Sequence, residues 1–225
     1  MIDILVPVLG RPQNAAPLVE NIRAVTTEEY RITFLCSRGD WAQAEACGDY
    51  ADTVVVGWEA GPGDYARKIN HGAMITAAWQ GEWIFQAADD LTFQPGWDTH
   101  ALAAAGDQFD VVATNDMSNG SVKRGVFGTH NLIRRRYITT TVLYEGYDHN
   151  FVDRELCGFA QQAGVYTFAR NSRVRHHHPL WRTAPNDPTY VKSLARFRED
   201  RELFLSRAHL WGYHGLSPQE RRMAA

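Results

Sequence analysis

Residues 1–115 alternate between short apolar runs and amphipathic segments, and this alternation restricts the fold more than any other feature. Apolar runs typical of strands occupy residues 2–8, 31–36, 53–56, 83–85 and 110–114. Segments with a helical spacing of apolar side chains separate them, at residues 14–24, 41–47, 65–79 and 97–105. Strands that alternate with helices of about 10–15 residues form βαβ units. The pattern predicts an α/β fold with a mostly parallel central sheet and flanking helices.

The pattern changes after residue 115. A polar, turn-rich stretch comes first, and we then expect strands at residues 128–133 and 165–168 and a helix at residues 148–162. Residues 190–207 place apolar side chains on one side and charges opposite, which predicts one long amphipathic helix packed on the core as a lid. Periodicity is lost in residues 216–225, so we expect a disordered tail there.

Composition excludes several classes of protein. The chain has 225 residues, 44% of them hydrophobic, and a net charge of −3, which disfavours a dedicated nucleic-acid binder. No apolar stretch approaches the roughly 20 residues that span a bilayer, so we expect no membrane insertion. The N-terminus has no basic leader, and three cysteines lack C-x-x-C spacing. We therefore expect reduced thiols and a cytoplasmic location.

Two adjacent carboxylates, Asp89 and Asp90, follow directly on the apolar run at residues 83–85, and Pro95-Gly96 ends the loop. Carboxylates at the carboxyl end of a strand lie where open α/β sheets bind ligands. Their hard oxygen atoms suit Mg²⁺ or Mn²⁺ that bridges a diphosphate. The alternative is that one acid caps a helix while the other is solvated.

The run Arg175-His176-His177-His178-Pro179 is a second concentration of polar groups. In an extended segment His176 and His178 point to one side and His177 to the other. Two such imidazoles can complete the coordination of a metal ion that has few carboxylate ligands. Three histidines in a surface loop are the alternative. Arginines at residues 134–136 and 170–182 add a basic face that can hold a phosphate-bearing ligand.

Four segments taken in order resemble glycosyltransferase family 2, whose members have an A-type nucleotide-sugar-binding fold. The segments are residues 6–12 (VPVLGRP), 68–72 (KINHG), 88–97 (ADDLTFQPGW) and 152–156 (VDREL). The resemblance covers roughly residues 2–180. It implies one catalytic domain over residues 1–215, with a nucleotide-binding half at 1–115, an acceptor and catalytic half at 116–189 and the C-terminal helix at 190–215.

The resemblance implies a set of residues for the nucleotide-sugar donor. The family's D-x-D motif falls on Ala87-Ala88-Asp89, so its first acid is missing and Ser37 or Asp40 would have to supply the ribose contact. The expected donor-binding residues are Pro7, Leu9, Arg11, Ser37, Asp40, Lys68, Asn70, Ala88 and Asp89. The expected ligands of a Mn²⁺ or Mg²⁺ cofactor are Asp89, Asp90, His176 and His178.

Transfer of a sugar needs a base for the acceptor hydroxyl, and the family's base is an acid in a Glu-Asp pair at a helix start. Here the pair reads Val152-Asp153, so Asp153 is the expected base. Helix capping is the alternative role. Direct displacement by the acceptor would invert the anomeric centre. The resemblance thus implies a metal-dependent inverting glycosyltransferase that uses a UDP-sugar or a similar donor.

Exposed indoles can stack on sugars, and Trp97 and Trp181, with Arg182, are the residues we expect at the acceptor. A place in the core or at its rim is the alternative for Trp97. The acceptor itself stays open between a glycan, a small molecule and a modified nucleic acid, and the oligomeric state is open too. Two other functions remain. The missing acids are compatible with a non-catalytic nucleotide-sugar-binding protein, and the same fold serves sugar nucleotidylyltransferases, although residues 9–12 match their Gly-rich loop poorly.

Overall fold

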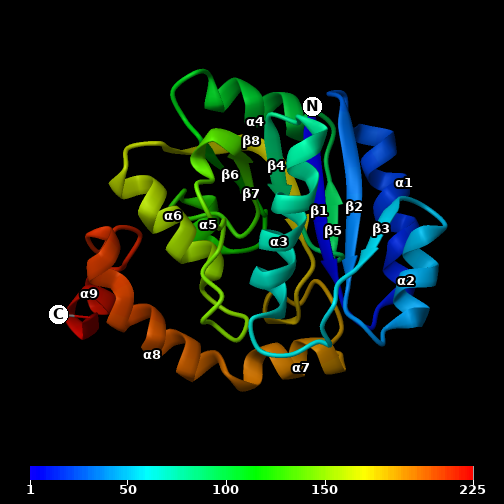
Figure 1. The fold of residues 1–225 in the computed structure, drawn as a ribbon. Coiled ribbons are helices and arrows are strands. Elements are labelled where there is room, and N and C mark those ends of the chain that lie inside the picture. Colours follow the sequence, from blue (N-terminus) through cyan, green and yellow to red (C-terminus); the bar gives the residue numbers. More distant parts are fainter. Residues whose placement is uncertain (225) are drawn as a thin grey trace.

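The computed structural model describes residues 1–224 and contains the strands expected in the first half of the chain (Figure 1). The strands are β1 (Ile2–Val8), β2 (Tyr30–Cys36), β3 (Asp52–Val55), β4 (Trp83–Gln86), β5 (Leu91–Phe93), β6 (Val111–Asn115), β7 (Asn131–Arg134) and β8 (Tyr166–His176). The helices are α1 (Ala15–Val25), α2 (Trp41–Gly48), α3 (Asp64–Ile75), α4 (Trp97–Ala105), α5 (Gly120–Lys123), α6 (Val152–Gln162), α7 (Pro188–Ala195), α8 (Phe197–Arg207) and α9 (Pro218–Ala224). Short 3-10 helices occupy residues 12–14, 76–79, 135–137, 179–181 and 208–211.

The strands form an eight-stranded sheet in the order β3-β2-β1-β4-β7-β6-β8-β5. β1 runs parallel to β2 and β4, β2 is parallel to β3, and β6 is parallel to β8. β7 is antiparallel to β4 and β6, and the short β5 is antiparallel to β8. The predicted α/β class is confirmed, and each antiparallel pair includes β7 or β8, which belong to the half of the chain whose pattern departs from strict alternation.

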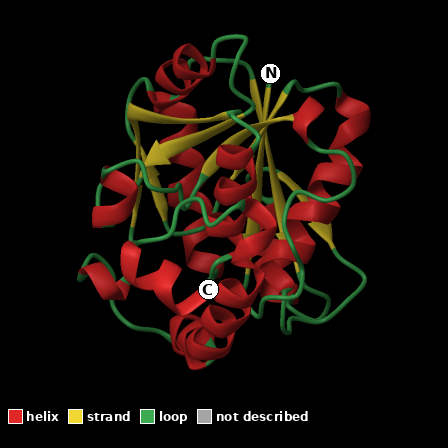
Figure 2. Ribbon diagram, turned by 90° about the vertical axis from the view of Figure 1, so that its left-hand side faces the viewer, coloured by secondary structure: helices red, strands yellow, loops and turns green. Residues whose placement is uncertain are grey.

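Helices cover both faces of the sheet, as Figure 2 shows in a view turned by 90° from Figure 1. The alternating side chains of β1 explain this arrangement, because successive residues of a strand point to opposite faces. Ile4 and Val6 belong to a core shared with α1, α2 and α4. Leu5 belongs to a second core shared with α3, α6 and α8. A strand buried on both sides has the near-continuous apolar sequence seen at residues 2–8.

The C-terminal segment differs from the prediction. The single helix expected over residues 190–207 is wrong, because the chain breaks at Arg196 into α7 and α8. The apolar stripe serves two different partners: the Tyr190 hydroxyl donates to Asp90 at 2.8 Å, while the ring of Phe197 packs 5.1 Å from that of Phe151. A pattern of spacing shows which residues share a side, but not that the two ends pack on different elements.

The tail expected to be disordered is also different. Residues 218–224 form α9, and Arg154 on α6 donates to Glu220 at 2.9 Å. The last residue of the predicted tail, 225, lies outside the described residues. This ion pair joins segments 66 residues apart, so local periodicity contained no sign of it.

Two composition-based expectations concern the whole chain. Cys36, Cys47 and Cys157 are all buried and free of disulfides. Over residues 1–224, no helix combines the length and the apolar character that a membrane crossing requires.

Parallel strands place their carboxyl ends at one edge, and this edge positions the candidate site. β1 and β2 both end at the lower edge in Figure 1, where α7 lies across them. The loop that contains Asp89 and Asp90 leaves β4 at the same edge, since β4 is parallel to β1. The fold therefore gathers the turn after β1, the acidic loop and the C-terminal segment.

Candidate functional site

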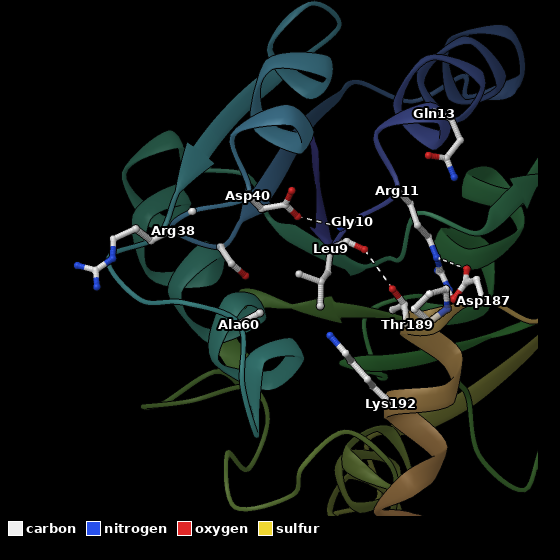
Figure 3. Close-up of a pocket in the computed structure, with 13 residues that line it drawn as sticks. Leu9, Gly10, Arg11, Gln13, Arg38, Asp40, Ala60, Asp187, Thr189 and Lys192 are labelled. Carbon is white, nitrogen blue, oxygen red and sulfur yellow. Dashed lines mark hydrogen bonds and ion pairs between the residues drawn. The ribbon is translucent and has the colours of Figure 1, made fainter.

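A hollow of about 540 Å³ opens at the carboxyl ends of β1 and β2, with α7 along one side (Figure 3). Its walls are the turns after the two strands and the start of α7. The lining residues are Leu9, Gly10, Arg11, Gln13, Ser37, Arg38, Gly39, Asp40, Ala60, Asp187, Pro188, Thr189 and Lys192. Of the residues expected at the donor, Leu9, Arg11, Ser37 and Asp40 line this hollow.

Asp40 and Gln43 hold the turn after β1 against the start of α2. The Asp40 carboxylate accepts from the backbone N–H of Gly10 at 2.8 Å, and Gln43 accepts from that of Arg11 at 2.7 Å. Gly10 has a φ of +63°, a conformation in which glycine carries no steric penalty. The Gly-Arg-Pro sequence thus forms a tight turn that carries Arg11 toward the acidic loop.

Lys68 lies under the hollow and is only 1% exposed. Its ammonium donates to the Val8 carbonyl at 2.8 Å and lies 2.7 Å from the Asp64 carboxylate. Asp64 also accepts from the Ser37 hydroxyl at 3.1 Å. Lys68 therefore braces the ends of β1 and β2 from beneath, where its charge is paired.

The remaining expected donor residues stand apart from the hollow. Pro7 is buried within β1, and Ala88 packs against the core below the acidic loop. The Asn70 amide oxygen accepts from the backbone of Val142 and Leu143, and its nitrogen donates to Leu143 at 2.8 Å. These bonds, with one more to Glu145, use the full capacity of the amide. Asn70 braces residues 142–145 and does not reach the hollow, which corrects that expectation.

Arg11 connects the hollow to the acidic loop. Its guanidinium is 3.1 Å from Asp89 and 3.6 Å from Asp90, and it also lies 2.8 Å from Asp187, the residue that caps α7. The ring of Tyr190 stacks on it at 4.0 Å. Burial and the adjacent Asp90 raise the pKa of the Asp89 carboxyl. A single buried cation therefore holds together three carboxylates from two distant segments.

Asp90 faces the end of β8, where its Oδ1 lies 3.6 Å from Nε2 of His176. Burial alone would raise the pKa of Asp90, yet His176 and the Tyr190 hydroxyl outweigh it and lower that pKa. Burial works against charging His176, but the carboxylates of Asp90, Asp116 and Asp153 outweigh it and raise the pKa of the imidazole. The carboxylate of Asp90 and the imidazole of His176 are thus brought together from segments that the sequence places 86 positions apart.

Asp90 and His176 offer two of the several ligands that a divalent cation needs. Asp90 Oδ1 and His176 Nδ1 are buried, and neither has a hydrogen-bond partner in residues 1–224. Within that same range, no three His, Cys, Asp or Glu side chains are grouped closely enough to hold a metal ion. Divalent cations at diphosphate sites usually take one or two protein ligands and complete their shell with phosphate oxygens and water. Asp90 and His176 fit that pattern.

The other two expected metal ligands are engaged elsewhere. Asp89 pairs with Arg11. The Nδ1 atom of His178 accepts from the backbone N–H of Leu180 at 3.2 Å, and burial followed by the charge of His176 lowers the pKa of His178 to about 4. His178 is therefore a neutral cap of the 3-10 helix at residues 179–181 and packs its ring 4.8 Å from that of Tyr190.

His130, which sequence reasoning missed, belongs to the same cluster. Its ring lies 5.0 Å from the ring of His176, and burial together with the charge of His176 lowers the pKa of His130 to about 3. A lone histidine before the apolar strand β7 gave no signal, because only the pairing of β7 with β4 and β6 brings it to this edge.

Asp153 is the second residue of α6, and its carboxylate accepts from the backbone N–H of Arg154 at 2.9 Å. That local bond is compatible with the capping alternative. Burial is the main cause that raises the pKa of Asp153 to about 6. The charge of Asp153 helps to raise the pKa of His176, and the charge of His176 in turn works to lower that of Asp153. A carboxylate with such a pKa is suited to accept a proton near neutral pH.

Glu155, two residues further along α6, cannot accept a proton from a substrate because its carboxylate is buried and bonded to other side chains. It is 3% exposed and accepts from Arg207 at 2.7 Å and from the Tyr147 hydroxyl at 2.6 Å. Both partners belong to the packing between α6, α8 and the preceding loop. Glu155 is therefore a structural acid, which leaves Asp153 as the candidate base at this helix start.

Trp97 is not available to an acceptor, which corrects the expectation. Its side chain is 0% exposed and lies 4.8 Å, ring to ring, from both Phe85 and Phe93. Its indole N–H donates to the Thr26 hydroxyl at 3.0 Å. Pro95-Gly96 turns the chain inward at this point, so the indole anchors α4 to the core.

Trp181 and Arg182 line a second hollow of about 430 Å³ together with Met117, Ser118, Arg175, Leu180 and Thr183. Trp181 is 37% exposed. Two lining residues bond to the backbone of His176, since its carbonyl accepts from the Ser118 hydroxyl at 3.3 Å and from the Thr183 hydroxyl at 3.4 Å. The expected acceptor residues Trp181 and Arg182 therefore share one hollow whose walls bond to the backbone of His176.

Four residues of α7 and its cap line the first hollow, and none of them is among the expected donor residues: Asp187, Pro188, Thr189 and Lys192. The Asn-Asp-Pro sequence at residues 186–188 signals a helix start. It contains no information about where that helix packs. Arg11 and Asp187 are 176 positions apart.

The chain matches no protein-family model. No curated protein matches it in sequence either. Solved structures do match. The mannosyltransferase PcManGT from Pyrobaculum calidifontis, in complex with GDP-Man and Mn²⁺, aligns with a TM-score of 0.60 at 12% identity, over 99% of this chain and 77% of that one.

Two further solved structures are similar. Glucosyl-3-phosphoglycerate synthase from Mycobacterium tuberculosis, in complex with Mn²⁺, UDP and phosphoglyceric acid, aligns with a TM-score of 0.60 at 13% identity, over 94% of this chain and 78% of that chain. TarS from S. aureus aligns with a TM-score of 0.63 at 11% identity, over 99% of this chain, which spans only 42% of the TarS chain. This chain therefore has the A-type glycosyltransferase fold.

Proposed function

We propose that the protein is a divalent-metal-dependent glycosyltransferase that moves a sugar from a nucleoside diphosphate to an acceptor hydroxyl with inversion. One observation carries the proposal: the carboxylate of Asp90, on the loop after β4, lies 3.6 Å from His176 at the end of β8 and 3.6 Å from Arg11, which lines the hollow at the end of β1. Complexes of similar structures with GDP-Man and Mn²⁺ or with UDP and Mn²⁺ support the same ligand class.

The nucleotide belongs in the hollow at the carboxyl ends of β1 and β2. Ser37 and Asp40 offer polar groups there for base or ribose, and Arg11 brings a guanidinium to the diphosphate end. Asp90 and His176 would hold Mn²⁺ or Mg²⁺. When bound, the ion supplies Lewis-acid stabilisation of the departing diphosphate.

Asp153 acts as the base. Its carboxylate takes the proton of the acceptor hydroxyl while the hydroxyl oxygen forms a bond to the anomeric carbon. The bond from that carbon to the diphosphate oxygen breaks, and its electron pair leaves with the diphosphate. Attack opposite the leaving group inverts the anomeric centre. Because the pKa of Asp153 is about 6, its carboxylate is mostly ionised at neutral pH and is still basic enough to take up that proton.

We place the acceptor in the hollow lined by Trp181 and Arg182. The exposed indole offers a stacking surface for a ring, and Arg175 and Arg182 add two positive charges. Acceptors that carry a phosphate or carboxylate are therefore the first to test.

One observation favours a second candidate, a non-catalytic nucleotide-sugar-binding protein. Arg11 already pairs with both acids of the loop, and residues 1–224 contain no group of three metal-ligating side chains. Titration of UDP and GDP with and without Mn²⁺, followed by a donor-hydrolysis assay, separates the two. Metal-dependent binding with slow hydrolysis supports transfer, binding without hydrolysis supports the second candidate, and no metal-dependent binding contradicts the proposal.

A further inference from the structure

Lys192 differs from the other cations of the donor hollow. Arg11 is surrounded by three carboxylates. Arg38 lies 3.6 Å from Glu59, and in Figure 3 its guanidinium points away from the hollow. The ammonium of Lys192 points into the hollow in the same view and makes no hydrogen bond or ion pair within residues 1–224. It is therefore the cation of this hollow that is free to bind a ligand.

The position of Lys192 is set by the contacts of α7. Asp187 caps the helix by accepting from the backbone N–H of Tyr190 at 2.9 Å, and the same carboxylate binds Arg11. The Thr189 hydroxyl donates to the Leu9 carbonyl at 3.4 Å, at the end of β1. Residues three apart on a helix lie on one side, so Lys192 faces the hollow with Thr189.

A diphosphate bound in the hollow needs a cation besides Arg11. The carboxyl groups of Asp89, Asp90 and Asp187 surround Arg11 at the inner end of the hollow, so the guanidinium is already paired. A diphosphate adds further negative charge. A divalent ion held by Asp90 and His176 would neutralise part of the charge of the diphosphate, and Lys192 would add a second cation from α7. Lysine binds phosphate as a compact point charge.

We infer that Lys192 is a donor-binding residue whose ammonium pairs with the diphosphate of the nucleotide sugar. This inference rests on the proposed function and adds to it a contact from the C-terminal helix. It makes α7 part of the donor site and not only a cover of the core.

The test compares UDP with uridine, since both contain the base and ribose and only UDP contains the diphosphate. Isothermal titration calorimetry with Mn²⁺ would measure Kd for the unchanged protein and for Lys192→Ala, Lys192→Arg and Arg198→Ala. We expect Lys192→Ala to weaken UDP binding by about 10- to 100-fold, the range of a charge-assisted hydrogen bond, and to leave uridine binding unchanged. Lys192→Arg should restore most of the loss.

Arg198→Ala is the control, because Arg198 is an exposed arginine of α8 that pairs with Glu202 and does not line the hollow, and it should change UDP binding by less than about twofold. Equal UDP affinity for Lys192→Ala and the unchanged protein would overturn the inference. An equal loss for UDP and uridine would also overturn it, because that result means a displaced α7. If the unchanged protein binds neither UDP nor GDP with Mn²⁺, the proposed function falls first, and the role of Lys192 falls with it.

Discussion

Replacement of Asp153 by Asn should remove sugar transfer and, at neutral pH, make the protein more stable. Asn has nearly the same shape as Asp but cannot accept the hydroxyl proton. Burial raises the pKa of Asp153 from the ordinary 3.8 to about 6, so the folded protein holds this proton more tightly than the unfolded chain does. Ionisation of Asp153 therefore costs stability, and the cost is absent at low pH and complete above the folded-state pKa.

The size of the effect follows from the two pKa values. A difference of about two pH units corresponds to about 2 to 3 kcal/mol at pH 7 and above. For a domain of this size the Asn variant should melt about 5 to 10 °C higher at pH 7.5. At about pH 4 the carboxyl of the folded protein is protonated, so the two proteins should melt within a degree or two of each other.

Thermal unfolding at both pH values and a transfer assay would check both parts. Loss of the base should lower kcat by about 10²- to 10⁴-fold, with UDP affinity unchanged. In the unchanged protein, kcat/KM should fall about tenfold per pH unit below pH 6 as Asp153 takes up its proton. Unchanged turnover would refute the role as base, and equal melting temperatures at pH 7.5 would refute the argument from burial.

The remaining predictions concern the metal and the two tryptophans. Asp90→Ala should abolish the dependence of UDP affinity on Mn²⁺ in calorimetry, and persistence of that dependence would exclude Asp90 as a ligand. His176→Ala should have the same effect, whereas His178→Ala should keep the dependence because His178 caps a 3-10 helix; equal behaviour of the two variants would contradict this assignment. Trp97→Ala should lower the free energy of unfolding by about 3–5 kcal/mol, measured by urea unfolding, because a buried indole is removed. Trp181→Ala should leave that free energy within about 0.5 kcal/mol and raise the KM for the acceptor; a cost in stability similar to that of Trp97→Ala would show that Trp181 is a packing residue.

Local patterns predicted most of the secondary structure of residues 1–115. β1, β2, β4 and α1 lie within one or two residues of the predicted ranges, because strand and helix periodicity depends on near neighbours. The same reasoning failed at Trp97, where an indole after a Pro-Gly turn was expected on the surface. Burial of that ring depends on Phe85 and Phe93, and their arrangement around it is a tertiary property.

The C-terminal segment shows the same limit. Apolar spacing predicted helix at residues 190–207, and helix is present there, but spacing did not reveal the break at Arg196 or the docking of α7 on the donor hollow. The pattern therefore did not single out Lys192 from the other charges of residues 190–207. The contacts that place it join residues about 180 positions apart, such as Thr189 and Leu9.

The amino-acid sequence by itself determined the class of fold and the positions along the chain of the acids and imidazoles that carry the proposed chemistry. Both are local properties, set by side-chain periodicity and by which residues follow each strand. The tertiary structure alone decided that Asp90 faces His176 while Asp89 pairs with Arg11, and that α7 borders the nucleotide hollow. Such choices depend on how distant segments pack, and adjacent residues like Asp89 and Asp90 become different only when their side chains meet different neighbours.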